Sequence, residues 1–285
     1  MEYDRKDGSR SIRQMNCLMK KGCIMKFDNI ILQKEGSVTF IKLNRPKEFN
    51  AINYGLLSDV VKALEVATDD VDTKVVVVNG EGKAFCAGGD LASFKNFPDN
   101  GEALRQIIKL LNLTIIGIRR MPKPVIAMIN GVTAGAGISI AAACDLRICA
   151  SSVKFKQAYT SVGLVPDGAF TLMVPLLIGF GKTSELYLLD PLIDSKQALE
   201  MGLVNRVVED AELEKVTKDI ALQLVKGASV SYAIVKENMN NAMLGILERQ
   251  LELERRGMIW AGRTADAREG IAAFLEKRKP SFSGR

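Results

Sequence analysis

The 285-residue sequence contains no histidine. This absence excludes Ser-His-Asp and Cys-His catalysis, and it removes the ligand that most catalytic zinc sites use. Any acid–base chemistry must therefore rely on Asp, Glu, Tyr, Lys or Cys side chains. The sequence also lacks an apolar run of the about 18 residues that a membrane-spanning helix needs, so we expect no membrane association.

Cysteine is scarce as well, and its spacing does not indicate metal binding. The five cysteines form no C-x-x-C pair, so we expect no metal site. An odd number of cysteines, together with the lack of a secretory signal, indicates free thiols and a cytoplasmic protein. The composition is otherwise that of a large globular domain, with 47% hydrophobic and 25% charged residues, which can bury a substantial core.

The first 25 residues differ from the rest of the chain. They carry six Lys or Arg residues against three Asp or Glu residues, and they lack the apolar core of a signal peptide. We expect residues 1–25 to be a disordered extension, or translation to start at Met25. The alternative is a basic arm that binds nucleic acid or a membrane.

Two glycine-rich turns, each after an apolar run, are the strongest local signals. Ala-Phe-Cys-Ala-Gly-Gly-Asp-Leu at 84–91 follows the run at 74–78, and Asn-Gly-Val-Thr-Ala-Gly-Ala-Gly at 130–137 follows the run at 124–129. Bare N–H groups at a helix start stabilise developing negative charge, so two such turns fit an oxyanion hole for an acyl carbonyl. The spacing matches neither a P-loop nor a dinucleotide-binding turn. The simpler interpretation of either turn is close packing of a helix on a sheet.

Apolar periodicity predicts an α/β core followed by helices. A hairpin at 30–43 turns at 34–37, and strands alternate with helices after it, which indicates a largely parallel sheet. The predicted strands are 75–79, 125–129 and 202–207, and the predicted helices are about 54–68, 102–120, 138–143, 169–178, 210–226, 228–243, 245–262 and 264–278. Leu247, Leu251, Glu254 and Met258 share one helical stripe, which fits a core position.

An ordered series of motifs resembles the crotonase family, the enoyl-CoA hydratase/isomerase superfamily. The matching segments are Leu-Asn-Arg-Pro-Lys at 43–47, Lys-Ala-Phe-Cys-Ala-Gly-Gly-Asp-Leu at 83–91, Lys-Pro-Val-Ile-Ala at 123–127, Phe-Lys-Gln-Ala at 155–158 and Val-Gly-Leu-Val-Pro-Asp at 162–167. The resemblance extends over residues 27–285. It implies a crotonase-like ββα spiral over 26–208, and a C-terminal helical region over 209–285 that builds trimer contacts and completes the coenzyme A site.

The resemblance also implies roles for single residues. Gly89 and Ala136 match the two positions whose backbone N–H groups form the oxyanion hole of the family. Ser139 and Tyr159 match the two glutamates with which hydratases hold and split water, and neither is a carboxylic acid. This chain therefore lacks both carboxylic acids that hydration by the usual route requires. Tyr159 either donates a hydrogen bond to the substrate or packs as an ordinary aromatic residue.

Asp167 is the acid that remains in a suitable place. It follows the Leu-Val-Pro turn at 164–166, where many isomerase members of the family carry the acid that shuttles a proton. One carboxylate can remove a proton from one carbon and return it two carbons away, and an apolar pocket would raise its pKa. The alternative is that Asp167 caps the helix at 169–178.

Further residues match positions that contact coenzyme A in relatives of the family. They are Lys47, Phe49, Ala87, Asp90, Leu91, Phe274 and Lys277. Asp90 also stands at the start of a predicted helix, where an aspartate is commonly a cap. We expect no cofactor beyond the CoA thioester of the substrate, and an assembly that is a homotrimer or a dimer of trimers.

Three functions are consistent with the sequence. The first is an enoyl-CoA double-bond isomerase in which Asp167 moves the proton while Gly89 and Ala136 stabilise an enolate. The second is a hydratase, or another enolate reaction such as decarboxylation, in the same pocket. The third is a non-catalytic relative that binds acyl-CoA or RNA, although Asp167 and the two intact turns argue against it and we expect no nucleic-acid partner.

Overall fold

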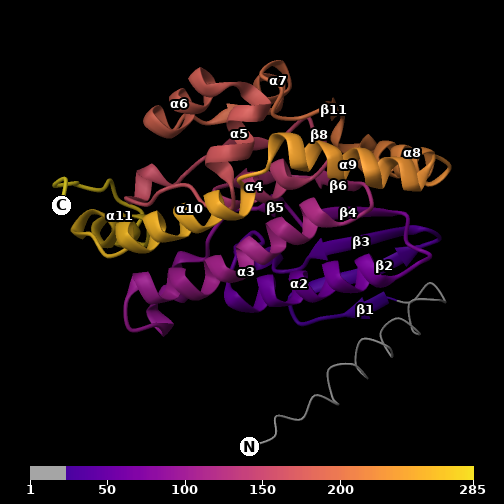
Figure 1. The fold of residues 1–285 in the computed structure, drawn as a ribbon. Coiled ribbons are helices and arrows are strands. Elements are labelled where there is room, and N and C mark those ends of the chain that lie inside the picture. The colour runs from indigo at the N-terminus through magenta and orange to yellow at the C-terminus, as the bar shows by residue number, and fades with distance from the viewer. Residues whose placement is uncertain (1–23) are drawn as a thin grey trace, which may run out of the picture.

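The computed structural model describes residues 24–285 and has an α/β core with a group of C-terminal helices (Figure 1). Of the expected N-terminal extension, residues 1–23 lie outside this range. The next residues form strand β1 (Ile24–Lys26), which pairs antiparallel with the following strand so that Met25 lies opposite Leu32. Within the described range, no helix combines the length and the apolar character that crossing a membrane requires.

Seven strands of this described part form the main sheet, in the order β1-β2-β3-β4-β6-β8-β11. The first three are antiparallel, and all later neighbours are parallel. Their bounds are β2 (Ile30–Glu35), β3 (Val38–Leu43), β4 (Val75–Gly80), β6 (Val125–Ile129), β8 (Leu146–Ala150) and β11 (Arg206–Val208). Strands β4 and β6 are buried along their whole length, which explains why their sequences are continuous apolar runs rather than alternating patterns.

A smaller sheet carries the glycine turns. Its order is β10-β9-β7-β5, with β5 (Ala84–Cys86), β7 (Val132–Ala134), β9 (Lys154–Lys156) and β10 (Ile193–Asp194). Strands β5, β7 and β9 are parallel. Because carboxyl ends of parallel strands meet at one edge of a sheet, segments 87–90, 135–136 and 157–159 leave the sheet side by side.

Two long amphipathic helices, α2 (Tyr54–Asp69) and α3 (Asn100–Arg120), pack against each other over the core. Each begins at a side-chain cap, because Asn53 accepts the N–H of Leu56 and Asp99 accepts the N–H of Glu102. Helix α4 (Ala136–Ala143) is different, since all of its residues are buried and it is apolar all round. The helices that follow are α5 (Phe170–Ile178), α6 (Phe180–Leu189) and α7 (Ser195–Glu200).

Four helices complete the chain, within a few residues of the ranges that the sequence predicts. They are α8 (Leu213–Val225), α9 (Ser229–Met243), α10 (Leu247–Ala261) and α11 (Ala265–Leu275). Helix α10 packs against α3 and α5, and α11 packs against the 3-10 turn η3 (Thr160–Val162), so the yellow end of the chain lies beside the magenta α3 (Figure 1). The last helices therefore cover the same part of the core as the glycine turns.

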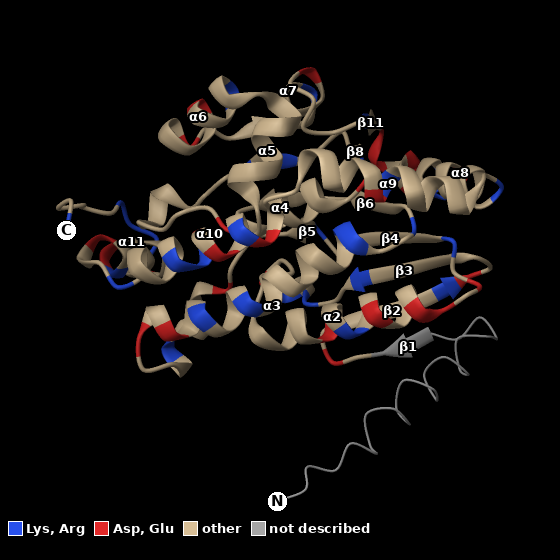
Figure 2. Ribbon diagram, in the orientation of Figure 1, with Lys and Arg blue, Asp and Glu red and all other residues tan. Residues whose placement is uncertain are grey.

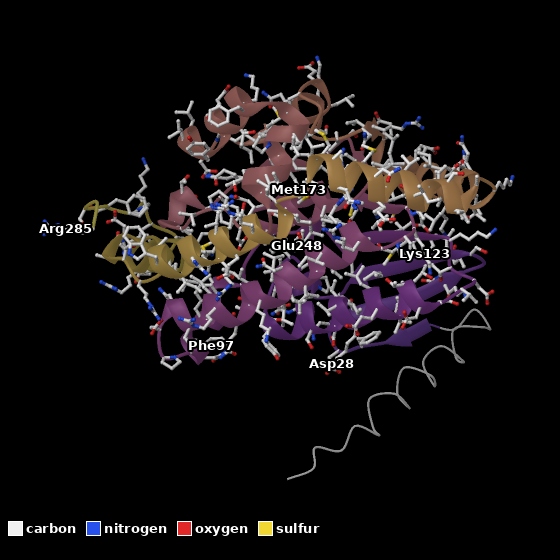
Figure 3. All side chains as sticks on the ribbon, in the orientation of Figure 1. Asp28, Phe97, Lys123, Met173, Glu248 and Arg285 are labelled. Atoms are coloured by element: carbon white, nitrogen blue, oxygen red, sulfur yellow. The ribbon has the colours of Figure 1, made fainter. Side chains whose placement is uncertain are left out.

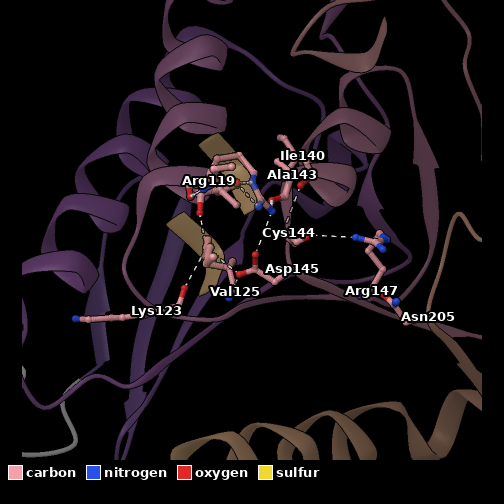
Figure 4. A network of polar contacts seen from close by, with 12 residues as sticks. Arg119, Lys123, Val125, Ile140, Ala143, Cys144, Asp145, Arg147 and Asn205 are labelled. Carbon is pink, nitrogen blue, oxygen red and sulfur yellow. Dashed lines mark hydrogen bonds and ion pairs between the residues drawn. The ribbon is translucent and has the colours of Figure 1, made fainter. Parts of the chain in front are cut away.

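A network of charges around the buried Lys236 attaches α9 to the core. The Lys236 ammonium donates to two backbone carbonyl groups and, at 2.8 Å, to Asp145 Oδ2. Asp145 also pairs with Arg119 at 3.1 Å (Figure 4), and Arg119 in turn donates to the Asn240 side chain. Removing one partner would leave a buried charge uncompensated, which is strongly unfavourable. The network thus fixes the position of α9 on the sheet.

Charged residues on the outer helices are mixed in sign. Helices α2 and α10 carry both Lys or Arg and Asp or Glu, whereas the charged residues of α3 after Glu102 are all basic (Figure 2). One ion pair joins two of these helices, between Arg120 of α3 and Glu248 of α10, which is labelled in Figure 3. Basic residues thus predominate on α3, while α2 and α10 are mixed in sign.

Candidate active site

A cavity of about 220 Å³ lies where the two glycine turns meet α3 and the C-terminal helices. Most of its wall is apolar and comes from segments far apart in the sequence, including Ile107, Leu111, Leu164, Met258 and Phe274. The polar side chains on this wall are Lys156, Tyr159, Ser161 and Asp167. The cavity is thus shaped for an apolar group that meets a few fixed polar atoms.

The first glycine turn reaches the cavity with its backbone. Ile52 donates its N–H to the Gly88 carbonyl at 2.7 Å and accepts the N–H of Asp90 at 2.8 Å. In such a parallel bridge the N–H of the residue between them, Gly89, points away from the partner strand, and Gly89 lines the cavity. A Cβ on Gly88, whose φ is +89°, would lie 3.0 Å from the Ala134 carbonyl oxygen, so close approach of the two turns depends on glycine here.

The second turn places a helix start on the same cavity. Gly135 precedes Ala136, the first residue of α4, and the N–H of a first helical residue has no partner within its helix. Ala136 lines the cavity together with Gly89. A Cβ on Gly137 would lie 2.3 Å from the Cys86 carbonyl oxygen, so the turns are in direct contact. The structure brings both predicted N–H positions to one cavity, and their use by a substrate stays a prediction.

Tyr159 and Asp167 form a buried pair in the cavity wall. The Tyr159 hydroxyl donates to Asp167 Oδ1 at 2.7 Å, and each residue is only 6% exposed. The Tyr159 ring also meets Phe170 edge to face, with ring centroids 6.1 Å apart. Tyr159 therefore packs as an aromatic residue and donates its hydroxyl proton to Asp167, and a hydrogen bond from Tyr159 to a substrate stays a prediction.

Burial dominates the ionisation of Asp167. Loss of solvent raises its pKa from 3.8 to about 7, against the opposing effect of the Tyr159 hydrogen bond, while the charge of Glu254 raises it further. Both protonation states of Asp167 are thus populated near neutral pH. Burial, reinforced by the Asp167 charge, raises the pKa of Tyr159 well above its ordinary value, so the phenol stays protonated and acts as a donor.

Ser139 supports the loop that carries Asp167. It is fully buried on α4, and its hydroxyl donates to the backbone carbonyl of Asp167 at 2.7 Å. A Cβ built on Gly168 would lie 2.9 Å from the Ser139 Cβ. The loop therefore passes directly over the position where hydratases of the resembled family carry a glutamate, and the short serine side chain fits there.

The structure assigns the cap of α5 to a residue other than Asp167. The N-cap residue is Ala169, at a φ of 62° and without a capping side chain. Glu254 of α10 accepts the N–H of Ala169 at 2.6 Å and that of Thr171 at 2.9 Å, and Glu254 is 5% exposed. Its contact with the Asp167 loop was missed from the sequence; the available signal was an acid within an apolar stripe.

The residues expected to contact coenzyme A fall into two groups. Ala87, Leu91 and Phe274 line the cavity. Lys47, Phe49, Asp90 and Lys277 lie outside its lining, although the Phe49 carbonyl accepts the N–H of Ala87 at 3.1 Å and so lies beside the first turn. Lys47 and Lys277 are exposed. Contact of these residues with coenzyme A stays a prediction.

Asp90 corrects one sequence-based expectation. It precedes the 3-10 helix η2 (Leu91–Asn96), but its side chain makes no capping hydrogen bond. Instead its carboxylate pairs with Arg45 at 2.9 Å, with both side chains mostly buried. A charged donor binds a carboxylate more strongly than a backbone N–H does, so the ion pair prevails over the cap and joins the first turn to the loop before η1 (Pro46–Glu48).

Comparison with known proteins assigns the chain to a family. Residues 33–285 match the family model described as Enoyl-CoA hydratase/isomerase. The chain belongs to this family. It is 32% identical over 265 residues to trans-2-decenoyl-[acyl-carrier-protein] isomerase of Streptococcus mutans, covering 92% of this chain and 100% of the relative. It is 34% identical over 259 residues to crotonyl-CoA hydratase of Syntrophomonas wolfei, covering 90% and 99%.

The solved structures agree with this assignment. A crystal structure of an enoyl-CoA hydratase from Mycobacterium avium subsp. paratuberculosis matches with a TM-score of 0.83 at 29% identity, over 90% of this chain and 100% of the other. The crotonase fold expected from the motifs is therefore confirmed, and the protein is an enzyme of the enoyl-CoA hydratase/isomerase family. Because its relatives include both isomerases and hydratases, the choice between these reactions rests on the residues of the cavity.

Proposed function

We propose that the protein is an enoyl-CoA isomerase that shifts a C=C bond, with Asp167 as the proton shuttle. One observation carries the proposal: of the described residues that line the cavity, Asp167 alone is an Asp or Glu. Its pKa of about 7 suits a group that accepts and returns a proton near neutral pH. The CoA thioester belongs to the substrate, and the reaction uses no other cofactor.

In this proposal the two glycine turns activate the substrate. In the proposed complex the thioester carbonyl oxygen accepts hydrogen bonds from the N–H groups of Gly89 and Ala136. The start of α4 behind Ala136 adds the positive end of the helix dipole. These fixed donors stabilise the negative charge that develops on the oxygen, and they thereby acidify C2 of a 3-enoyl-CoA.

The proton then moves between two carbons. The Asp167 carboxylate removes a proton from C2, and the C–H electron pair enters a dienolate that extends to C4. The carboxylic acid formed returns the proton to C4, which leaves the double bond between C2 and C3. Because Tyr159 donates to Oδ1, we assign Oδ2 as the oxygen that carries the proton.

Hydration has less support than isomerisation. It needs one group to take a proton from water and another to deliver a proton to carbon. At the two positions concerned, the Ser139 hydroxyl donates to the Asp167 carbonyl and the Tyr159 hydroxyl donates to the Asp167 carboxylate. Neither side chain is a base at neutral pH, so Asp167 would have to perform both steps alone.

Decarboxylation and RNA binding find less support than isomerisation in the residues that the structure describes. A decarboxylase must hold a second carboxylate, yet the cationic side chain of the cavity, Lys156, pairs with Asp190 at 3.2 Å, and an ionised Asp167 would repel such a substrate. An RNA-binding relative would be expected to present a basic stripe, whereas α2 and α10 carry charges of both signs and Arg120 of the more basic α3 is paired with Glu248 of α10. The pairing of Lys156 and the charge of Asp167 favour an uncharged acyl group in the cavity.

The test compares two thioesters. Purified protein is incubated with 3-hexenoyl-CoA or crotonyl-CoA. The products are separated by liquid chromatography, which resolves the isomers, and their masses are measured by mass spectrometry. We expect conversion of 3-hexenoyl-CoA to the 2-enoyl isomer without a change in mass, and slow or no hydration of crotonyl-CoA. Rapid addition of water to crotonyl-CoA with no isomerisation of 3-hexenoyl-CoA would overturn the proposal.

A further inference from the structure

Helix α5 begins directly after the loop that carries Asp167. The side chain that caps it, Glu254, comes from α10 in the C-terminal region. The first N–H groups of a helix lack partners within the helix. Here the two oxygens of Glu254, on α10, accept the N–H groups of Ala169 and Thr171 and also the Thr171 hydroxyl. One side chain from 85 residues further along the chain therefore fixes the backbone on which Asp167 stands.

The hydrogen bonds define the charge of Glu254. Gln250 donates its amide N–H to Thr171 Oγ1 at 2.8 Å, so the Thr171 hydroxyl proton is free to point at Glu254 Oε1. With donors from Thr171 and Ala169 around both oxygens, Glu254 has no acceptor for a proton of its own. Burial raises the pKa of Glu254 above its ordinary value, and these hydrogen bonds oppose the rise because donors around both oxygens stabilise the carboxylate form.

We propose that Glu254 is the positioning residue of the catalytic acid Asp167. Its carboxylate accepts the first N–H groups of α5 and thereby holds the Asp167 loop against the cavity. This inference rests on the proposed role of Asp167 as proton shuttle. It assigns to the C-terminal helix a function in the reaction that is separate from lining the cavity. Glu254 does not line the cavity itself, so it acts through Asp167 rather than on the substrate.

The same contact sets the electrostatics of Asp167. An uncapped helix start stabilises a nearby anion, and it would therefore favour ionised Asp167 and weaken it as a base. Glu254 occupies these N–H groups and adds a negative charge, which raises the pKa of Asp167. The other polar groups facing Asp167 are the Tyr159 hydroxyl, which lowers that pKa, and the uncharged Ser139 hydroxyl on its backbone.

The experiment separates this role from simple support of the fold. Glu254→Gln removes the charge and turns an amide N–H toward donors, whereas Glu254→Asp keeps the charge but shortens the reach. Glu248→Gln is the matched control, since Glu248 lies on the same helix but pairs with the exposed Arg120. For each variant, kcat and KM are measured with 3-hexenoyl-CoA over pH 5–9, together with the melting temperature.

For Glu254→Gln we expect kcat to fall roughly 10- to 100-fold, the loss of a hydrogen-bonded charge, with KM changed less than threefold. The acid limb of the pH profile should move to lower pH, because removing a negative charge lowers the pKa of Asp167. Glu254→Asp should keep the limb in place while kcat falls, and Glu248→Gln should match the wild type. An unchanged kcat and limb in Glu254→Gln, with only a lower melting temperature, would overturn the proposal.

Two further measurements keep the result interpretable. Titration of the Asp167 carboxyl carbon by ¹³C NMR, assigned with Asp167→Asn, needs no substrate, so it reports the coupling to Glu254 even if the isomerase proposal fails. If Glu254→Gln does not fold, Thr171→Val removes one donor to Glu254 while keeping the shape of the side chain. A several-fold fall in kcat at unchanged KM would support the proposal, and wild-type kinetics would overturn it.

Discussion

The hydroxyl of Tyr159 donates a 2.7 Å hydrogen bond to Oδ1 of Asp167 on the wall of a mostly apolar cavity. This hydrogen bond stabilises the carboxylate, whereas burial destabilises it, and burial has the larger effect on the pKa. The pKa of Asp167 is therefore set by two opposing effects, burial and the Tyr159 hydrogen bond. Changing either one should move its titration in a direction that can be stated in advance.

Replacing Asp167 with Asn should abolish most of the isomerase activity. Asn keeps the size of the side chain and can still accept the Tyr159 hydrogen bond, but it cannot take a proton. We expect kcat to fall by about 10²–10⁴, the usual contribution of a general base, while acyl-CoA affinity measured by calorimetry changes little. Glu248→Gln, which changes an exposed carboxylate paired with Arg120, is the control and should retain the wild-type rate. More than about a tenth of the wild-type kcat in Asp167→Asn would contradict the assignment.

The same substitution should stabilise the fold at neutral and higher pH. Asp167 has a folded pKa of about 7 against an ordinary value of 3.8, so folding disfavours its charged form. The resulting penalty is absent below the unfolded pKa, grows as pH rises, and is complete above about pH 7, where it reaches at most about 4 kcal/mol.

Chemical denaturation of wild type and Asp167→Asn at pH 4.5 and pH 8.5 tests this expectation. The variant should gain stability over the wild type mainly at the higher pH. Equal differences at both pH values would show that Asp167 titrates normally in the folded protein.

Tyr159→Phe should shift the pH profile in the direction opposite to Glu254→Gln. The phenol stabilises the Asp167 carboxylate, so its loss raises the pKa of Asp167 and moves the acid limb of kcat to higher pH. The aromatic contact with Phe170 is preserved by phenylalanine, which limits the loss of stability. Steady-state rates from pH 5 to 9 measure the shift, and a limb that stays in place would mean that Tyr159 does not influence the base.

The assembly remains a prediction, and we expect a trimer or a dimer of trimers. Helix α9 exposes Val230, Val235, Met239 and Met243, and three of these side chains line an open groove of about 790 Å³. Apolar surface of this extent is typical of an interface. Light scattering should give three or six times the mass of one chain, and Val235→Glu should reduce it. A stable, active monomer would contradict this expectation.

Much of the fold follows from patterns that are local in the sequence. The runs at 75–79 and 125–129 predict buried parallel strands, and the structure places β4 and β6 there. The two glycine turns could likewise be assigned to a common site as an oxyanion hole, although the short strands β5 and β7 within their ranges were not predicted. Helix bounds differ by only a few residues, since caps such as Asn53 and Asp99 mark them.

The partners of the site residues could not be obtained in this way. Asp90 looks like a cap from its position, but Arg45 lies 45 residues earlier and binds it instead. Glu254 looks like a core position, because periodicity reports which face of a helix is buried and not what lies opposite. Such contacts depend on how distant elements are packed, and only the folded structure shows them.

The wall of the cavity includes Met258 of α10 and Phe274 of α11, which come late in the sequence. During synthesis, the strands and the glycine turns leave the ribosome long before these helices do. A nascent chain can therefore assemble its sheets while its acyl pocket is still open on one side and α5 still lacks its cap. The enzyme becomes competent only when the final helices dock, so a premature stop after residue 246 should yield a protein without turnover.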